Sequence, residues 1–304
     1  MSGIRVTQST ISRNSIHNLQ SSLSKLSRLQ EQQSSGKLIT KPSDDPSGAV
    51  DSLRYRSEQR RNLQYSRNAI DAKGWLGTAD TTLTDSLDYV RRARDLVVQG
   101  ATGTIGAQER QALATEVENI RTALIGISNT AYLGRPIFAG NANPSASGLP
   151  TYDSAGTYNG DAGAVMRTVG SGDEKVQVNV TGPELFGSGS SSLFAVLQTI
   201  VDHLRGSSVS DVNALGSTDI TALDNARNVV QNKLAEVGSR ENSVDITAQR
   251  QSDNDIHIAT NLSDIEDIDL AKTIMDLQLQ QTAYQASLKA TASVIQPSLM
   301  DFLK

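Results

Sequence analysis

Apolar side chains recur at helical spacing over most of the chain. The first series alternates between steps of three and four residues and consists of Ile16, Leu19, Leu23 and Leu26. This spacing is typical of a coiled-coil seam. The series ends at Ser34–Gly36, where Gly36 suits the left-handed residue that closes many helices.

A second helical pattern begins directly after Ser34–Pro46, a stretch with two prolines, a glycine and paired aspartates. It runs to Gln99, and Asp44 or Ser43 is expected to cap it. A turn over residues 100–106 precedes a further helix at Gln108–Ile127. Ser34–Pro46 is therefore predicted to be an elbow between helices. Its hinge residues are Gly36, Pro42, Asp44, Asp45 and Pro46.

The C-terminal part is helical again, with a short pattern at Leu193–Arg205 and a heptad series from Ile220. The phase shifts after Ile265, and a new series consists of Leu270, Ile274, Leu277, Tyr284, Leu288 and Ile295. Long amphipathic helices need a partner along the apolar face. The N- and C-terminal series are therefore predicted to pair with each other and to form the coiled-coil or assembly interface.

The segment from Asn129 to Ser192 has a different composition, rich in Gly, Ser, Asn and Pro beyond residue 140. Two β-branched runs, Ala164–Val169 and Lys175–Val180, flank a Gly-rich loop and predict a β-hairpin. The expected fold is mainly α and elongated. Its terminal helices pair as a coiled coil or helical bundle, and it carries a small β-rich insert domain.

The charge distribution is uneven although the net charge of the chain is only −5. Met1–Asp45 carries six basic and three acidic side chains, whereas Gln251–Lys304 carries three basic and eight acidic ones. Such ends can attract each other within a chain or between neighbours; solvated helix faces with a chance imbalance explain the pattern equally well. The absence of cysteine excludes disulfides and thiolate metal sites.

The sequence contains no strong catalytic, metal or cofactor motif, so neither an enzyme nor a cofactor is expected. The three histidines lie in separate helical patterns, and Ser34 with Lys37 matches an SxxK spacing that is common by chance. The paired aspartates are better explained by helix capping than by cation binding. The acids of residues 264–269 fit a solvated face or a partner for basic residues. Neither nucleic-acid binding nor a membrane span is expected.

Several segments resemble the flagellin superfamily. The resemblance is carried by RVTQSTISRNSIHNL (Arg5–Leu19), LQEQQSSGKLITKPSDDPSGA (Leu29–Ala49), NTAYLGRPIFAG (Asn129–Gly140), YNGD (Tyr158–Asp161) and the C-terminal segment from Asp267 to Leu303. Within the superfamily, the RVTQST opening, the GRPIFAG ending and the SLMDFL tail are more similar to hook-associated proteins of the hook–filament junction than to filament flagellins.

This resemblance implies an innermost domain of residues 1–45 with 259–304, a helical middle domain of 46–140 with 193–258, and an outer β-rich insert of 141–192. It also implies a structural, self-assembling ring protein of the bacterial flagellum, exported to the outside of the cell through the type III channel. The implied partners are further copies of the chain, a neighbouring hook-associated protein, flagellin, and a cytosolic chaperone that holds the C-terminal helix.

Three alternatives to the junction role remain open. The chain could be the filament flagellin itself, or carry an enzyme in the insert. The insert is short, however, and has no histidine between Asn141 and Ser192. The third alternative is receptor binding, because Val90–Gln99 with Glu116 resembles the flagellin surface that vertebrate innate receptors recognise.

Overall fold

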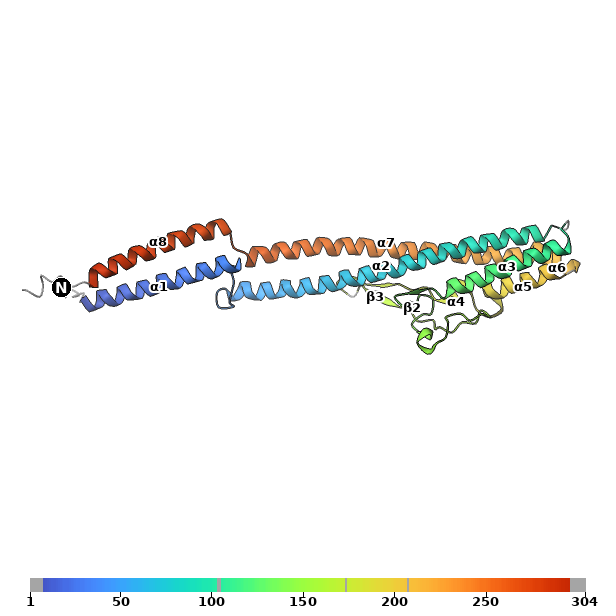
Figure 1. Ribbon diagram of the computed structural model, residues 1–304, viewed down its shortest axis with the longest axis horizontal. Coiled ribbons are helices and arrows are strands. Elements are labelled where there is room, and N and C mark those ends of the chain that lie inside the picture. Colours follow the sequence, from blue (N-terminus) through green and yellow to red (C-terminus); the bar gives the residue numbers. More distant parts are fainter. Residues whose placement is uncertain (1–7, 103–104, 173, 207, 296–304) are drawn as a thin grey trace, which may run out of the picture. The chain divides into compact units, whose positions relative to one another are not determined.

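The computed structural model describes residues 8–102, 105–172, 174–206 and 208–295. Most of these residues are helical, which confirms the mainly α fold with a small β insert (Figure 1). The principal helices are α1 (Gln8–Ser35), α2 (Pro46–Gly100), α3 (Ala107–Ser128), α5 (Leu193–Arg205), α7 (Ile220–Glu266) and α8 (Leu270–Ile295).

The chain divides into two compact units, and each is described by itself. The first unit comprises residues 1–61 and 255–304, and the second comprises residues 62–254. Helices α2 and α7 contribute residues to both units, so the boundary falls inside continuous helices. The three-part domain division that the resemblance implies stays a prediction.

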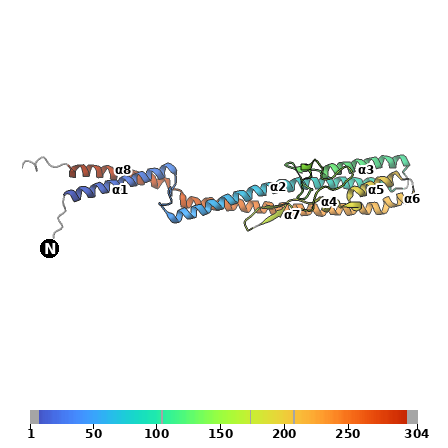
Figure 2. The ribbon, with the colours of Figure 1, turned by 90° about the horizontal axis from the view of Figure 1, so that it is seen from below.

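In the first unit, α1 lies alongside α8, as both views show (Figures 1 and 2). Helix α1 ends where Gly36 adopts a φ of +70°, and the Gly36 amide donates to the Gln32 carbonyl. A left-handed residue turns the chain away from the helix axis while it satisfies a terminal carbonyl. The predicted helix end at Gly36 is confirmed.

In the second unit, α2 and α7 run antiparallel, because contacts at successively higher residues of α2 involve lower residues of α7. Asn62 donates to the Gln251 carbonyl, and Arg94 pairs with Asp224 at 2.8 Å. Helices α3 and α5 pack against each other in the same unit. A continuous apolar core links these helices through buried residues that include Trp75, Leu76, Leu83, Val117, Leu124, Leu197, Ile200, Leu223, Val230 and Val237.

The insert between α3 and α5 consists of two hairpins and short helices. Strands β1 (Ala131–Tyr132) and β2 (Arg135–Pro136) pair antiparallel, as do β3 (Met166–Thr168) and β4 (Lys175–Gln177). The hairpin predicted from the β-branched runs is thus confirmed. The short helix α4 (Gly182–Phe186) follows β4, and α6 (Val209–Ala214) with a π-helical turn (Leu215–Asp219) precedes α7. A buried aromatic cluster consists of Phe138, Tyr152, Phe186 and Phe194.

Gly140 holds the start of the insert against a later loop. Its φ is +71°, and a Cβ added there would lie 2.1 Å from the Asp161 carbonyl oxygen. The Asp161 amide donates to the Ala139 carbonyl and its carboxylate accepts from the Asn141 amide. A side chain at Gly140 would therefore break these contacts.

We expect Gly140→Ala to lower the free energy of unfolding by about 3–4 kcal/mol, because backbone strain adds to a steric clash. Gly134→Ala is the matched control, since Gly134 also has a positive φ but has open space around it. That variant should lose only about 1 kcal/mol. Urea unfolding of both variants measures the difference, and equal losses would contradict the role given to the Asp161 contact.

Candidate functional site

The elbow begins the long helix α2 with a side-chain cap at Asp45. The Asp45 carboxylate accepts hydrogen bonds from the Ser47 amide at 3.1 Å and the Ser47 hydroxyl at 2.8 Å. The Ala49 amide donates to the Asp45 carbonyl at 2.9 Å, and Pro46 occupies the first helical position. Hydrogen bonds from the Gly48 amide and the Ser47 hydroxyl hold the pKa of Asp45 below its usual range. The expectation that Asp44 or Ser43 caps this helix is therefore wrong by one or two residues.

Asp44 closes the loop itself rather than capping the helix. Its carboxylate accepts from the Thr40 hydroxyl and the Lys41 amide, both at 3.0 Å. These backbone and hydroxyl bonds, led by that from Lys41, lower the pKa of Asp44. Ion pairs of Asp44 with Arg28 at 3.8 Å and of Lys41 with Glu31 at 3.3 Å tie the loop back to α1. Pro42 lies exposed in this turn.

The two connections that lead to the terminal helices hold each other. Lys37 and Asp267 form an antiparallel bridge between the α1–α2 loop and the α7–α8 linker. The Leu38 amide donates to the Glu266 carbonyl at 2.5 Å, and the Ile268 amide donates to the Gly36 carbonyl at 3.2 Å. The Lys37 ammonium lies 2.6 Å from the Asp267 carboxylate. Each linker therefore supplies the backbone partners that the other one needs.

Glu266 is the buried charge of this junction between linkers. It is the last residue of α7, is only 3% exposed, and pairs with Arg56 of α2 at 2.7 Å and with Lys37 at 3.3 Å. Burial alone would raise the pKa of Glu266, but hydrogen bonds from Arg56 and Lys37 outweigh it and hold the pKa below its usual range. One carboxylate thus connects the end of α7, the start of α2 and the elbow.

The acids of residues 264–269, which the sequence predicts to form a solvated face or to pair with basic residues, have different surroundings in the structure. Glu266 and Asp267 have basic partners, whereas Asp264 is exposed. Asp269 accepts from the Lys272 amide at 3.1 Å at the start of α8. The cluster therefore combines ion pairing, helix capping and solvation.

The α1–α8 pair buries a narrow seam. On α8 the buried or half-buried positions are Thr273, Ile274, Leu277, Gln280, Tyr284, Ser287 and Thr291, and apart from Ile274 they recur at steps of four and three residues. On α1, among the residues whose side chains are described, they are Thr10, Ser15, Leu19, Ser22, Leu26, Leu29 and Gln32. The Gln280 amide group donates to the Ser22 carbonyl across the seam at 3.1 Å. Polar side chains thus occupy about half of the seam, which limits its apolar stabilisation.

The predicted interface residues fall into two groups. Leu19, Leu26, Ile274, Leu277 and Tyr284 are buried or half-buried, whereas Ile16, Leu23, Leu270 and Leu288 are exposed in the single chain. Ile295 ends α8, and its side chain lies outside the described residues. The assembly role of these residues stays a prediction. Sequence reasoning missed Gln32, Thr273 and Gln280, because polar residues gave no apolar signal.

Helix α8 also has apolar side chains that its contact with α1 leaves largely exposed. Met275 is 62% exposed and Leu279 is 70% exposed. A helix that is apolar on several faces is typical of a buried position with several neighbours. One α1–α8 pair offers only one neighbour, so these side chains remain available to another chain.

Two of the remaining chemical candidates make structural contacts. The Lys37 amine of the SxxK pattern contacts Glu266 and Asp267. His203 lies 2.7 Å from Asp219 at the π-helical turn. Among the described residues, no group of three His, Cys, Asp or Glu is placed to hold a metal ion. None of the described helices is long and apolar enough to cross a membrane.

The segment that resembles a receptor-binding surface is only partly on the surface. Arg92 is exposed and pairs with Glu116 at 2.6 Å, whereas Leu96 is buried in the core. A substitution of Leu96 would therefore perturb packing as well as any surface contact.

A pair of terminal helices with exposed apolar side chains, connected to long helices through an elbow, is typical of a class of subunits that pack further against one another in an assembly. Comparison with known proteins identifies that class. Residues 6–143 match the bacterial flagellin N-terminal helical region, and residues 220–303 match the bacterial flagellin C-terminal helical region. The chain belongs to the bacterial flagellin family, whose members are structural proteins of the flagellum.

Individual relatives agree with this assignment. Flagellar hook-associated protein 3 of Escherichia coli K12 is 30% identical over 295 residues, which cover 90% of this chain and 92% of that protein. A flagellin of Bacillus subtilis is 27% identical over 296 residues, or 93% of this chain and 94% of that protein. The crystal structure of the flagellar junction protein FlgL from Legionella pneumophila covers 72% of this chain and 100% of its own, with a TM-score of 0.57 and 14% identity. This last likeness concerns the fold.

We expect the linker junction to loosen in acid. The pKa values of Glu266 and Asp267 lie below their ordinary values of 4.5 and 3.8, so their contribution is complete above those values. It is lost as the pH falls further, through the lowered pKa values. Amide exchange at residues 36–40 and 266–269, compared between pH 6 and pH 3 after correction for intrinsic rates, measures this loss.

Glu266→Gln should show about tenfold faster exchange in these linkers already at pH 6, because charge-assisted hydrogen bonds are lost. Its further response to acid should be smaller than that of the unmodified chain. Glu31→Gln removes an exposed ion pair with Lys41 and should change little. An acid response that is unaltered in Glu266→Gln would assign it to other groups.

Proposed function

We propose that this chain is a structural subunit of the junction between the flagellar hook and filament, where copies of it assemble into a ring. The observation that carries the proposal is the exposed apolar surface of the α1–α8 pair, where Met275 and Leu279 are mostly uncovered in the single chain. Similarity to a hook-associated protein over nearly the whole of both chains supports the junction over other flagellar positions.

The physical argument rests on the cost of leaving such a pair alone in water. Each fully buried Leu or Met side chain stabilises a structure by about 1.5–3 kcal/mol relative to an exposed one. The seam between α1 and α8 is half polar, so additional burial between copies would make a substantial difference to the terminal helices. Assembly and ordering of these helices would then be linked by mass action.

The finer partner assignments belong to this proposal. The axial neighbours would be another hook-associated protein on the hook side and flagellin on the filament side. The subunit would reach the outside of the cell by type III export. A cytosolic chaperone would cover α8 before export, since the same exposed apolar side chains would otherwise promote aggregation.

We expect Leu279→Asp to abolish incorporation into flagella while it leaves the isolated chain folded. A carboxylate at this exposed position is solvated in the single chain, but it must be desolvated in an apolar contact between copies. Gln278→Asp is the matched control, because Gln278 is exposed next to Leu279 and the substitution adds the same negative charge.

The measurement is complementation of cells that lack this chain, with electron microscopy of hooks and filaments. Circular dichroism of the purified variants checks that helix content is unchanged. Normal filament-bearing hooks with Leu279→Asp would contradict the proposed role of this face.

A second candidate function is that of filament flagellin, because the Bacillus subtilis flagellin aligns over 93% of this chain. Purified protein added to filament fragments separates the two. A junction subunit should stop after a terminal layer, since its two axial neighbours differ, whereas a flagellin should extend the filament to many times the seed length. Labelled protein viewed by electron microscopy gives the length of the added segment.

A further inference from the structure

The β3–β4 hairpin packs against both long helices of the second unit, α2 and α7. Its register pairs Met166 with Gln177 and Thr168 with Lys175. Val165, Val169, Val178 and Val180 are all buried in the same core as residues of α2 and α7. The hairpin therefore shares its apolar face with both helices.

Strand β3 is held by α2. The Asn68 side-chain amide donates to the Thr168 carbonyl at 2.7 Å, and Arg167 donates to the Asp71 carboxylate at 2.6 Å. The Arg167 guanidinium also lies 5.9 Å from the ring centre of Trp75, within the range of a cation–π contact. These contacts span two turns of α2.

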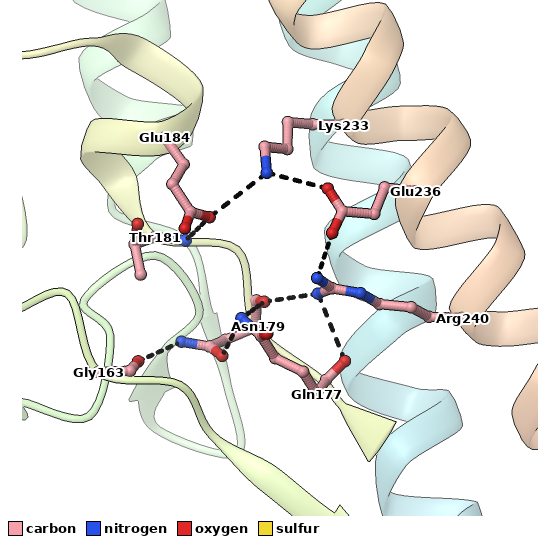
Figure 3. Close-up of polar contacts among 8 residues, drawn as sticks. All are labelled: Gly163, Gln177, Asn179, Thr181, Glu184, Lys233, Glu236 and Arg240. Atoms are coloured by element: carbon pink, nitrogen blue, oxygen red, sulfur yellow. Dashed lines mark hydrogen bonds and ion pairs between the residues drawn. The ribbon is translucent and has the colours of Figure 1, made fainter. Parts of the chain in front are cut away.

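The segment from β4 to α4 is held by α7 (Figure 3). Arg240 donates to the carbonyl of Asn179 at 2.9 Å, reaches that of Gln177 at 3.4 Å, and pairs with Glu236 on its own helix. Lys233 lies between Glu184 of α4 and Glu236, at 3.6 Å and 2.9 Å. Two neighbouring carbonyls and a carboxylate thus converge on one guanidinium (Figure 3).

The Asn179 side chain connects the segment after β4 to the segment that leads into β3. Its side chain is buried, accepts from the Val165 amide at 2.8 Å and donates to the Gly163 carbonyl at 2.9 Å (Figure 3 shows the bond to Gly163). The contact from Arg240 to the Asn179 backbone is therefore continuous with the chain that enters β3. At the hairpin tip, Glu174 pairs with Thr247 at 3.2 Å and Arg250 at 3.6 Å, both on α7.

We propose that the β3–β4 hairpin is a brace that fixes α2 against α7, with Arg240 as its anchoring residue. Few direct polar contacts between these helices are seen alongside the hairpin. The ion pair of Lys73 with Asp245 at 2.8 Å has both side chains about half exposed, and such pairs add little. The hairpin supplies buried valines and charge-assisted hydrogen bonds to both helices instead.

The brace predicts effects that cross from one helix to the other. Asn68 contacts the hairpin from α2, so Asn68→Ala should accelerate amide exchange in α7 over residues 236–250. Arg240 contacts it from α7, so Arg240→Ala should accelerate exchange in α2 over residues 64–76. We expect about tenfold for Arg240→Ala, since a charged donor to two carbonyls is lost, and about threefold for Asn68→Ala.

The experiment is amide hydrogen exchange of the full-length chain, followed by mass spectrometry. Arg240→Lys keeps the charge beside Glu236 but not the forked donor geometry, so its effect should be intermediate. Lys73→Ala is the matched control, because it removes a direct ion pair between α2 and α7 without touching the hairpin, and it should change exchange less than twofold.

Faster amide exchange confined to residues 163–180 would overturn the proposal. The hairpin would then pack on α2 and α7 without stabilising the contact between them. An effect of Lys73→Ala as large as that of Arg240→Ala would also overturn it. If Arg240→Ala lowers the yield of folded protein, Asn68→Ala and Arg240→Lys still decide the question, because each removes less of the network.

Discussion

The terminal helices carry more apolar surface than a contact between two helices can cover. In the α1–α8 pair a half-polar seam is closed, while Leu279, Met275 and Leu270 remain exposed. A helix pair of this kind is marginal by itself and gains stability from each further neighbour. The first unit would therefore gain stability from contacts with other chains. Self-assembly, which membership of the flagellin family implies, is consistent with this imbalance between available and buried apolar surface.

The α1–α2 loop and the α7–α8 linker determine how the terminal helices α1 and α8 are connected to the long helices α2 and α7. Of the two elbow prolines that the sequence predicts as hinge residues, Pro46 begins α2. The contacts give more weight to Glu266, whose buried carboxylate meets Arg56 and Lys37, and to the backbone bridge between Lys37 and Asp267. The elbow is thus completed by residues more than two hundred positions away. A chain that is threaded N-terminus first would lack these partners until its last helices arrive, so the turn and the helix pair would form together.

The helices, the hairpin and the elbow can be predicted from the sequence, because hydrophobic periodicity, β-branched runs and a Gly–Pro-rich break each have a local cause. The residues of the α1–α8 seam can be predicted only in part. Leu277, Tyr284 and Ile274 are buried or half-buried on α8, but Thr273 and Gln280 lie in the same seam without an apolar signal. Because α8 carries apolar residues on several faces, the sequence does not show which face packs on α1. Only the contact between the two helices determines that face. The partners of Glu266 were equally hidden, since ion pairs between distant segments leave no periodic signal.

The two units differ in how their stability is supplied. The second unit has a continuous core with fully buried aromatic side chains and, through the hairpin, polar anchors on both α2 and α7. The first unit has a seam of Thr, Gln, Ser and scattered Leu side chains. Segments that order on assembly are drawn from the low-stability end of a structure. A hairpin that holds α2 against α7 would keep the second unit ordered in the single chain, without contacts from neighbouring copies. The order of the first unit would then be the part of the structure that responds to assembly.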